Sequence, residues 1–238
     1  MLYLIGLGLN KKGISAEGLE LVKRCKQVYL ENYTVDFPYS LIELGEVIGK
    51  KIIPVEREFV EGLSIVDEAK KKDVALLVYG SPLSATTHIS LINEAKSSGI
   101  KVKVIYSGSV LDAVAESGLQ LYKFGKITSM PAWKQSFTPT SFMEVVKENQ
   151  SIEAHSLILV DIGLDFRDAL RQLKTSAEEH KIQLSKLVVC QSLGTNNRKI
   201  FYKSLEELKE FNGVRKPYCM IIPGKLHFVE SEMLNNFR

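Results

Sequence analysis

The chain has 238 residues, of which 45% are hydrophobic and 25% charged, and this suits one large globular domain or two small ones. Its 31 basic residues are scattered among 28 acidic ones, and a net charge of +3 is too small to indicate nucleic-acid binding. No apolar run approaches the roughly 20 residues of a membrane span, and residues 1–9 lack the basic lead of a signal peptide. Three widely separated cysteines favour buried free thiols in a cytoplasmic protein.

The first half of the chain alternates short apolar runs with segments of helical periodicity, which is typical of α/β architecture. The nearly continuous apolar run 2–9 predicts a strand buried on both faces that ends in a turn at Gly6 and Gly8. Residues 16–28 have helical spacing, and we expect them to pack on that strand. The other elements predicted here are strands at 51–55, 74–79 and 101–106 and a helix at about 87–98.

The character of the sequence changes near residue 108, which predicts two α/β domains, 1–108 and 109–238. Residues 109–112 fit a capping box ahead of a helix, and residues 123–131 predict a polar strand and loop. The remaining predictions are strands at 156–162, 186–191, 200–203 and 218–223, helices near 141–148 and 166–181, a short helix capped by residues 204–207, and a last helix that starts within residues 223–230.

The glycines at residues 6–9 are the first candidate for a ligand site. They do not form G-x-G-x-x-G, since Lys11 follows, so a dinucleotide fingerprint is not supported. A tight structural turn is the favoured interpretation, and a ligand contact stays open.

Residues 80–88, GSPLSATTH, are the best candidate for a binding loop, because open α/β sheets bind ligands where strands end and helices begin. A plainer alternative is that Thr86 or Thr87 caps the next helix, and both interpretations can hold together. For His88, a helix-start residue that is hydrogen-bonded to its surroundings is favoured over a base.

Two later turns carry weaker signals. Ser109, in the loop 106–110, is equally well explained as a helix N-cap and as a ligand contact. In the turn 223–230, Lys225 is expected to be a solvated lysine and His227 a partly buried histidine. The four histidines share no metal-binding spacing, so we expect no metal site, and the absence of G-x-S-x-G argues against a hydrolase elbow.

Five segments together resemble the archaeal diphthine synthases, a family within the tetrapyrrole methylase superfamily. They are residues 2–9 (LYLIGLGL), 80–88 (GSPLSATTH), 121–126 (LYKFGK), 139–149 (PTSFMEVVKEN) and 222–230 (IPGKLHFVE). They occur in the family's order and spacing, and the similarity extends from residue 1 to about residue 234. The resemblance implies two α/β domains with a cofactor cleft between them, and a homodimer.

The resemblance also implies a methyltransferase that binds S-adenosylmethionine and releases S-adenosylhomocysteine. Carried over position by position, the cofactor contacts are Leu9, Ser81, Ser84, Ser109, Val110, Val160, Leu193 and Tyr218. The chain departs from the family at Ser81, where Asp is common, at Tyr218, where His is frequent, and at residues 191–194, where A-R-x-G is common. No residue is assigned as a catalyst.

The implied substrate is a histidine of translation elongation factor 2 that already carries an aminocarboxypropyl group. Trimethylation of its amine gives diphthine, a step of diphthamide biosynthesis. Glu31, Tyr33, Lys123 and His227 are candidate contacts on the substrate side, with a surface role at least as well supported for each. Two alternatives stay open: a relative that methylates a corrin precursor or ribosomal RNA, although no basic stripe is seen, and a cofactor binder that docks on the elongation factor without turnover.

Overall fold

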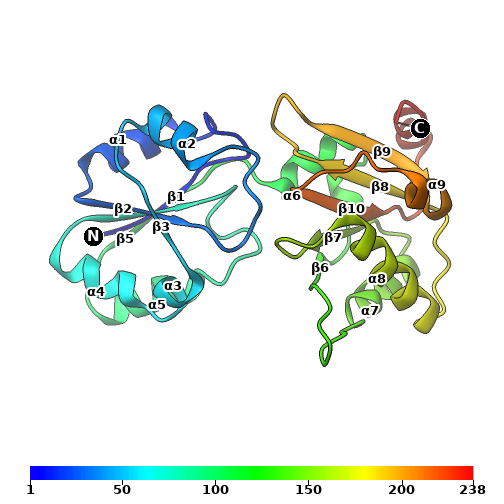
Figure 1. Cartoon of the computed structure of the whole chain (residues 1–238), viewed down its shortest axis with the longest axis horizontal. Coiled ribbons are helices and arrows are strands. Elements are labelled where there is room, and N and C mark those ends of the chain that lie inside the picture. The colour runs from blue at the N-terminus through cyan, green and yellow to red at the C-terminus, as the bar shows by residue number, and fades with distance from the viewer. Residues whose placement is uncertain (238) are drawn as a thin grey trace. The chain divides into compact units, whose positions relative to one another are not determined.

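The computed structural model describes residues 1–237 and divides into two compact units, Met1–Leu111 (unit 1) and Asp112–Arg238 (unit 2). The boundary predicted after residue 108 lies slightly before this division, which falls within the short helix α6, Val110–Ala113. Each unit has its own sheet with helices packed on it (Figure 1), which confirms the predicted α/β class.

Unit 1 contains a fully parallel five-stranded sheet in the order β3-β2-β4-β1-β5. Its strands are β1 Leu2–Gly6, β2 Gln27–Glu31, β3 Ile53–Val55, β4 Val74–Val78 and β5 Val102–Ile105. Its helices are α1 Ala16–Arg24, α2 Leu41–Ile48, α3 Arg57–Glu61, α4 Ser64–Lys71 and α5 Ile89–Ser97. Helices α1 and α2 cover one face of this sheet, and α3, α4 and α5 cover the other (Figure 1).

Strands β1 and β4 of unit 1 are almost entirely apolar because both of their faces are covered. Successive side chains of a strand point to opposite faces. Leu4 and Leu76 accordingly belong to the core under α3, α4 and α5, whereas Ile5 and Leu77 belong to the core under α1 and α2. This two-sided burial is the physical reason that the apolar runs at 2–9 and 74–79 predicted strands correctly.

The predicted helix at 16–28 is wrong in its last part, since α1 ends at Arg24 and residues 27–31 form β2. Cys25 already has extended backbone angles, φ −63° and ψ 142°. The strand sequence QVYLE combines a β-branched and an aromatic residue and is buried at four of its five positions, which overrides the helical spacing. Helices α2, α3 and α4, all of eight residues or fewer, were also missing from the prediction.

Unit 2 contains a mixed sheet in the order β6-β7-β10-β8-β9, in which only β6 and β7 pair in parallel. Its strands are β6 Thr128–Met130, β7 Ser156–Val160, β8 Lys186–Gln191, β9 Lys199–Ser204 and β10 Tyr218–Ile222. Its helices are the 3-10 turns η1 Val114–Ser117 and η2 Leu121–Lys123, and α7 Phe142–Ser151, α8 Phe166–Glu179, α9 Leu205–Glu210 and α10 Phe228–Asn235.

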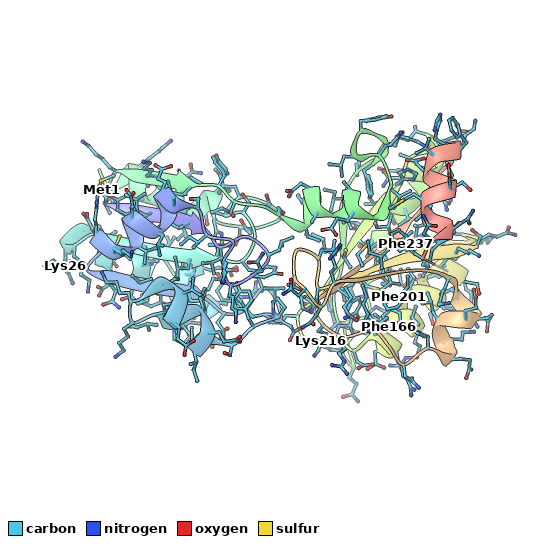
Figure 2. The ribbon with its side chains drawn as sticks, turned by 90° about the horizontal axis from the view of Figure 1, so that it is seen from above. Met1, Lys26, Phe166, Phe201, Lys216 and Phe237 are labelled. Carbon is cyan, nitrogen blue, oxygen red and sulfur yellow. The ribbon has the colours of Figure 1, made fainter. Side chains whose placement is uncertain are left out.

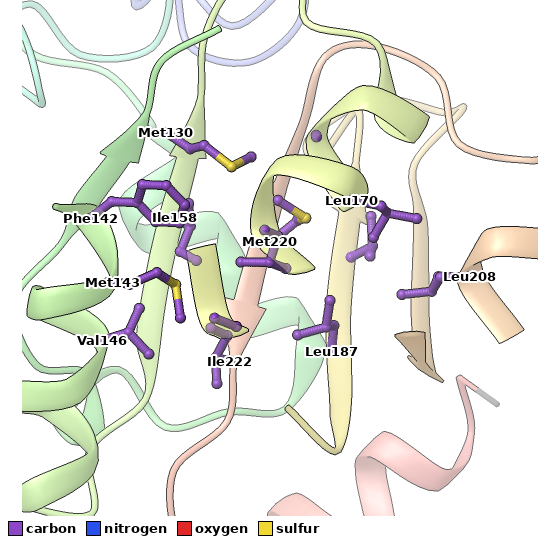
Figure 3. Close-up of a cluster of buried hydrophobic side chains, with 14 of the residues drawn as sticks. Met130, Phe142, Met143, Val146, Ile158, Leu170, Leu187, Leu208, Met220 and Ile222 are labelled. Atoms are coloured by element: carbon purple, nitrogen blue, oxygen red, sulfur yellow. The ribbon is translucent and has the colours of Figure 1, made fainter. Parts of the chain in front are cut away.

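One buried cluster forms the core of unit 2. Figure 3 shows Met143 of α7 and Leu170 of α8 among the side chains that gather on the sheet strands with Ile158 and Met220. Ser204 and Glu207 form the predicted capping box at the start of α9. The cysteines are buried and free as expected, namely Cys25, Cys190 and Cys219. Within residues 1–237, no helix combines the length and the apolar character of a membrane span.

Candidate functional site

Three loops of unit 1 meet at the carboxyl edge of its sheet. Strand β1 lies between β4 and β5, so the residues that follow these three parallel strands emerge side by side. Gly8 and Gly80 exchange two backbone hydrogen bonds of 3.1 and 3.0 Å, and Ser107 Oγ donates to the Gly13 carbonyl at 2.9 Å. Met1 and Lys26 mark the opposite, amino edge (Figure 2).

The glycines at this edge allow the loops to pack in direct contact. A Cβ atom on Gly6 would lie 2.6 Å from the Gly80 carbonyl oxygen and 3.0 Å from Ser107 Cβ. Gly8 has φ +66°, a left-handed conformation that costs a residue with a side chain roughly 1–2 kcal/mol. The favoured interpretation of residues 6–9 as a tight structural turn is therefore confirmed.

Four of the predicted cofactor contacts lie on these three loops, namely Leu9, Ser81, Ser84 and Ser109, and a fifth, Val110, begins α6 directly after the third loop. Tyr79 Oη donates to the Leu9 carbonyl at 3.1 Å, and the Ser84 amide donates to the Ser81 carbonyl at 3.0 Å. Ser109 Oγ accepts from the Leu111 amide at 3.3 Å, as its interpretation as a helix N-cap requires. Serine hydroxyls and the backbone groups of turns can both donate and accept hydrogen bonds, which suits the ribose and the methionine part of S-adenosylmethionine.

The loop at residues 80–88 is held by side chains different from those expected. The predicted capping of α5 by Thr86 or Thr87 is wrong, because Thr86 Oγ1 donates back to the Pro82 carbonyl at 2.7 Å and Thr87 Oγ1 to Glu61 at 3.2 Å. His88 occupies the N-cap position of α5. Its predicted character, a helix-start residue bonded to its surroundings, is confirmed.

The other three predicted contacts lie at one edge of the unit 2 sheet. Tyr218, which begins β10, is the register partner of Gln191, which ends β8, and the next pair along β10 joins Cys219 to Leu159, the neighbour of Val160. The Tyr218 ring packs edge-on against Phe166 with ring centroids 5.4 Å apart, and its hydroxyl donates to the Leu164 carbonyl at 3.1 Å. Phe166 and the nearby Lys216 are labelled in Figure 2.

Leu193 is placed at this edge by a constrained turn. Ser192 has φ +47°, a left-handed conformation that is rare for a residue with a side chain, and its amide donates to the Pro217 carbonyl at 2.9 Å. The predicted contacts thus gather in two groups, one at a sheet edge of each unit.

A cavity of about 450 Å³ opens at the opposite edge of the unit 2 sheet, where β7 begins and β10 ends. Its lining includes Lys123, Phe124, Ile152, Glu153, Lys225 and His227. Lys225 is exposed, as predicted, and pairs with Glu153 at 3.1 Å. His227 is exposed instead of partly buried, because it caps the start of α10 through its own backbone and ring and leaves the rest of the ring in solvent.

Glu230 is fully buried behind that cavity. It accepts hydrogen bonds from the backbone amides of Gln120 at 2.9 Å and His227 at 2.7 Å, and it pairs with Lys123 and His155. Burial alone would raise the pKa of this carboxyl, but the four donors outweigh burial and lower the pKa to about 2. Lys123, proposed from the sequence as a substrate contact, is therefore neutralised within the protein.

Glu31 and Tyr33 lie in and just after β2 in unit 1, and their exposed fractions of 1% and 9% exclude a surface role. Glu31 forms a buried ion pair with His88, a contact that the sequence did not reveal. Residues 27–31 were not predicted as a strand, so nothing placed Glu31 beside the loop at 80–88. Within residues 1–237, no group of three or more His, Cys, Asp or Glu side chains is arranged to hold a metal ion.

Residues 1–209 match the family described as Tetrapyrrole (Corrin/Porphyrin) Methylases. The chain is 36% identical to the diphthine synthase of Methanocaldococcus jannaschii over 252 residues, which cover 98% of this chain and 97% of that one. It is 34% identical to the diphthine methyl ester synthase of Schizosaccharomyces pombe over 266 residues, covering 100% and 94%. A crystal structure of a diphthine synthase superposes with a TM-score of 0.89 at 34% identity, covering 99% of this chain and 95% of that chain.

Proposed function

The chain belongs to the tetrapyrrole methylase family and groups there with the diphthine synthases, and on this premise we propose that it methylates the aminocarboxypropyl-modified histidine of translation elongation factor 2. It is a methyltransferase of diphthamide biosynthesis. The observation that carries the proposal is identity of about a third over essentially the full length of both chains, which leaves neither unit without a counterpart.

We propose that S-adenosylmethionine contacts the residues expected from the sequence, which are Leu9, Ser81, Ser84, Ser109 and Val110 in unit 1 and Val160, Leu193 and Tyr218 in unit 2. When bound, it supplies an activated methyl group on a sulfonium. The task left to the chain is to align the acceptor with that methyl group and to exclude water.

The acceptor amine has to lose a proton before it can attack. An alkyl amine has a pKa of about 10 and is mostly charged at neutral pH, so a site that disfavours its charged form by desolvation supports the reaction. The elongation factor is the proposed protein partner. A homodimer and a cytoplasmic location, both expected from the sequence, remain part of this proposal.

The proposal is tested by incubating the protein with isotopically labelled S-adenosylmethionine and elongation factor 2 that carries or lacks the aminocarboxypropyl group on its histidine. Mass analysis of the histidine-containing peptide is the readout. We expect label on the extended histidine alone. Cofactor binding without transfer to the extended histidine would refute the assignment, and transfer to ribosomal RNA or a corrin precursor would favour the relative that the sequence left open.

A second product is supported by the names of the eukaryotic relatives. The Schizosaccharomyces pombe protein is called a diphthine methyl ester synthase, and it is nearly as similar to this chain as the archaeal diphthine synthase is. The same peptide distinguishes the two products, because mild base removes a methyl ester as methanol and leaves methyl groups on nitrogen in place. A base-stable product of three methyl groups supports diphthine, and one further, base-labile methyl group supports the ester.

A further inference from the structure

A buried chain of contacts ties the loop at residues 80–88 to the neighbouring strand β2. Glu31, the last residue of β2, and His88, at the start of α5, have exposed fractions of 1% and 2%. His88 Nε2 forms an ion pair with Glu31, whose carboxylate also accepts a hydrogen bond from Thr34. Because β2 and β4 are adjacent in the sheet, this pair links the end of β2 to the last residue of the loop that follows β4.

The other ring nitrogen of His88 holds the loop itself. His88 Nδ1 donates to the Pro82 carbonyl at 2.8 Å, and Thr86 Oγ1 donates to the same oxygen at 2.7 Å. Ala85, which lies between Pro82 and Thr86 in the sequence, has φ +56°, a conformation that a residue with a side chain adopts only under constraint from its surroundings. Pro82 lies between Ser81 and Ser84, so the imidazole fixes the turn that presents both serines.

The partners of the two nitrogens determine the protonation of this pair. A carbonyl oxygen only accepts, so Nδ1 carries a proton, and a second proton lies between Nε2 and the Glu31 carboxyl. Burial lowers the pKa of His88, but the hydrogen bond and charge of Glu31 and the Pro82 carbonyl outweigh burial, so its pKa is raised. Glu61 of α3 adds to this effect and also accepts from Thr87, and Arg57 of α3 pairs with Glu61 and stacks on Tyr33.

His155 in unit 2 is a natural contrast. It is also fully buried and bonded to a carboxylate, with Nε2 3.1 Å from Glu230. Its Nδ1, however, accepts from the Gly224 amide at 2.9 Å and therefore carries no proton. Burial outweighs the Glu230 contact and lowers the pKa of His155. Both histidines have a carboxylate at Nε2, but Nδ1 of His88 must donate a hydrogen bond whereas Nδ1 of His155 must accept one.

We propose that Glu31 and His88 are positioning residues for methyl transfer, which hold Pro82 and thereby the serines at 81 and 84 in the conformation that binds S-adenosylmethionine. This inference rests on the proposed function and deepens it. Neither side chain reaches solvent, so they act through the loop and do not contact the acceptor. Removal of the shared proton leaves a lone pair of Nε2 facing a carboxylate, so the hold weakens as pH rises.

Two substitutions break the tie at different points. In His88→Asn the amide nitrogen takes the place of Nδ1 and keeps the Pro82 contact while losing Glu31. In His88→Gln it takes the place of Nε2 and keeps Glu31 while losing Pro82. For each, we expect the Kd and the KM for S-adenosylmethionine to rise on the order of tenfold, as for a lost hydrogen bond to a charged group, with kcat changed by less than about threefold.

Glu31→Gln is the conservative variant. Its amide bonds to a neutral imidazole and maintains the tie without the shared proton. At pH 6.5 we expect its affinity for the cofactor to be within about twofold of the parent's. Above pH 6.5 the parent's affinity should fall because its shared proton is lost, whereas the affinity of Glu31→Gln should change only as far as the titration of the ligand itself requires. The ratio of variant to parent Kd at each pH cancels the titration of the ligand itself.

His155→Gln is the matched control, since it makes the same change at an equally buried histidine of unit 2. We expect it to lower the melting temperature and to leave cofactor affinity unchanged. Parental affinity in both His88 variants, with only a lowered melting temperature, would overturn the proposal, and so would a flat Kd ratio for Glu31→Gln.

Hydrogen exchange keeps this inference separable from the proposed function. The Ser84 amide is bonded to the Ser81 carbonyl in the loop, and we expect it to lose protection in both His88 variants without any ligand. A parent that binds the cofactor but methylates nothing would refute the function alone. Unchanged protection of Ser84 would refute the positioning role alone.

Discussion

Glu230 shows how a fully buried carboxylate is kept ionised by two backbone amides together with the side chains of Lys123 and His155. Its folded pKa of about 2 lies below the ordinary value of 4.5, so the unfolded chain binds the proton more tightly. The stabilisation is therefore fully present above pH 4.5 and is lost as pH falls through the interval towards 2.

We predict that Glu230→Gln lowers the free energy of unfolding by about 3 kcal/mol at neutral pH, since it leaves Lys123 and a backbone donor without the buried charge. The difference from the parent should shrink as the pH is lowered below 4.5. Urea unfolding over a pH series measures both effects. Glu153→Gln is the control, because its pair with Lys225 is largely exposed and its loss should go undetected.

Single residues were predictable from the sequence where their role depends on neighbours along the chain. The turn glycines, the cap at Ser204 and the hydrogen-bonded character of His88 are of this kind. The partners of His88 and Glu230 were not predictable. Glu31 lies 57 positions from His88, and Gln120 lies 110 positions from Glu230, so only the tertiary fold brings the members of each pair together.

At the scale of elements, the packing of the three loops of unit 1 depends on the small size of Gly6. We predict that Gly6→Ala lowers the free energy of unfolding by about 1–3 kcal/mol, because its Cβ meets the Gly80 backbone and no flexible side chain is there to yield. Cofactor affinity should fall as well, because the displaced loop carries Ser81.

Gly45→Ala provides the control for this prediction. Gly45 lies within α2, and no heavy atom lies within 4 Å of the position that a Cβ would take there, so alanine should raise stability by roughly 0.5–1 kcal/mol. Thermal unfolding of both variants measures the contrast. A Gly6→Ala protein as stable as the parent would show that the loops have room to separate.

Elements buried on both faces were the most predictable part of the fold. Strands β1, β4 and β8 have continuous apolar runs, and the sequence located each to within three residues. Strand β2 was missed because it follows α1 after only two residues, so its apolar positions continued the helical spacing. Short helices at the surface of unit 1 carried too few periodic positions to be recognised.

At the scale of the whole molecule, each hydrophobic core is confined to one unit. The clusters of unit 1 contain no residue of unit 2, and the reverse also holds for the described residues. Unfolding of one unit therefore need not expose the core of the other.

We predict that Leu173→Ala, in the core of unit 2, destabilises that unit by about 2–5 kcal/mol. Amides of β7, β8 and β10 should then exchange faster, while those of β1 and β4 keep parental protection. Leu76→Ala, in unit 1, should give the reciprocal pattern. Equal acceleration in both sheets would show instead that the two units open together.

The three buried thiols can report which unit has opened, because each becomes reactive only when its own unit unfolds. One cysteine lies in unit 1, and Cys190 and Cys219 are cross-strand partners in unit 2. Burial raises the pKa of the Cys25 thiol to about 11, so it is also unreactive at neutral pH while folded. A pulse of maleimide would therefore add one label to a molecule in which unit 1 has opened and two labels to a molecule in which unit 2 has opened. Intact mass spectrometry counts the labels, and their number identifies the unit that opened.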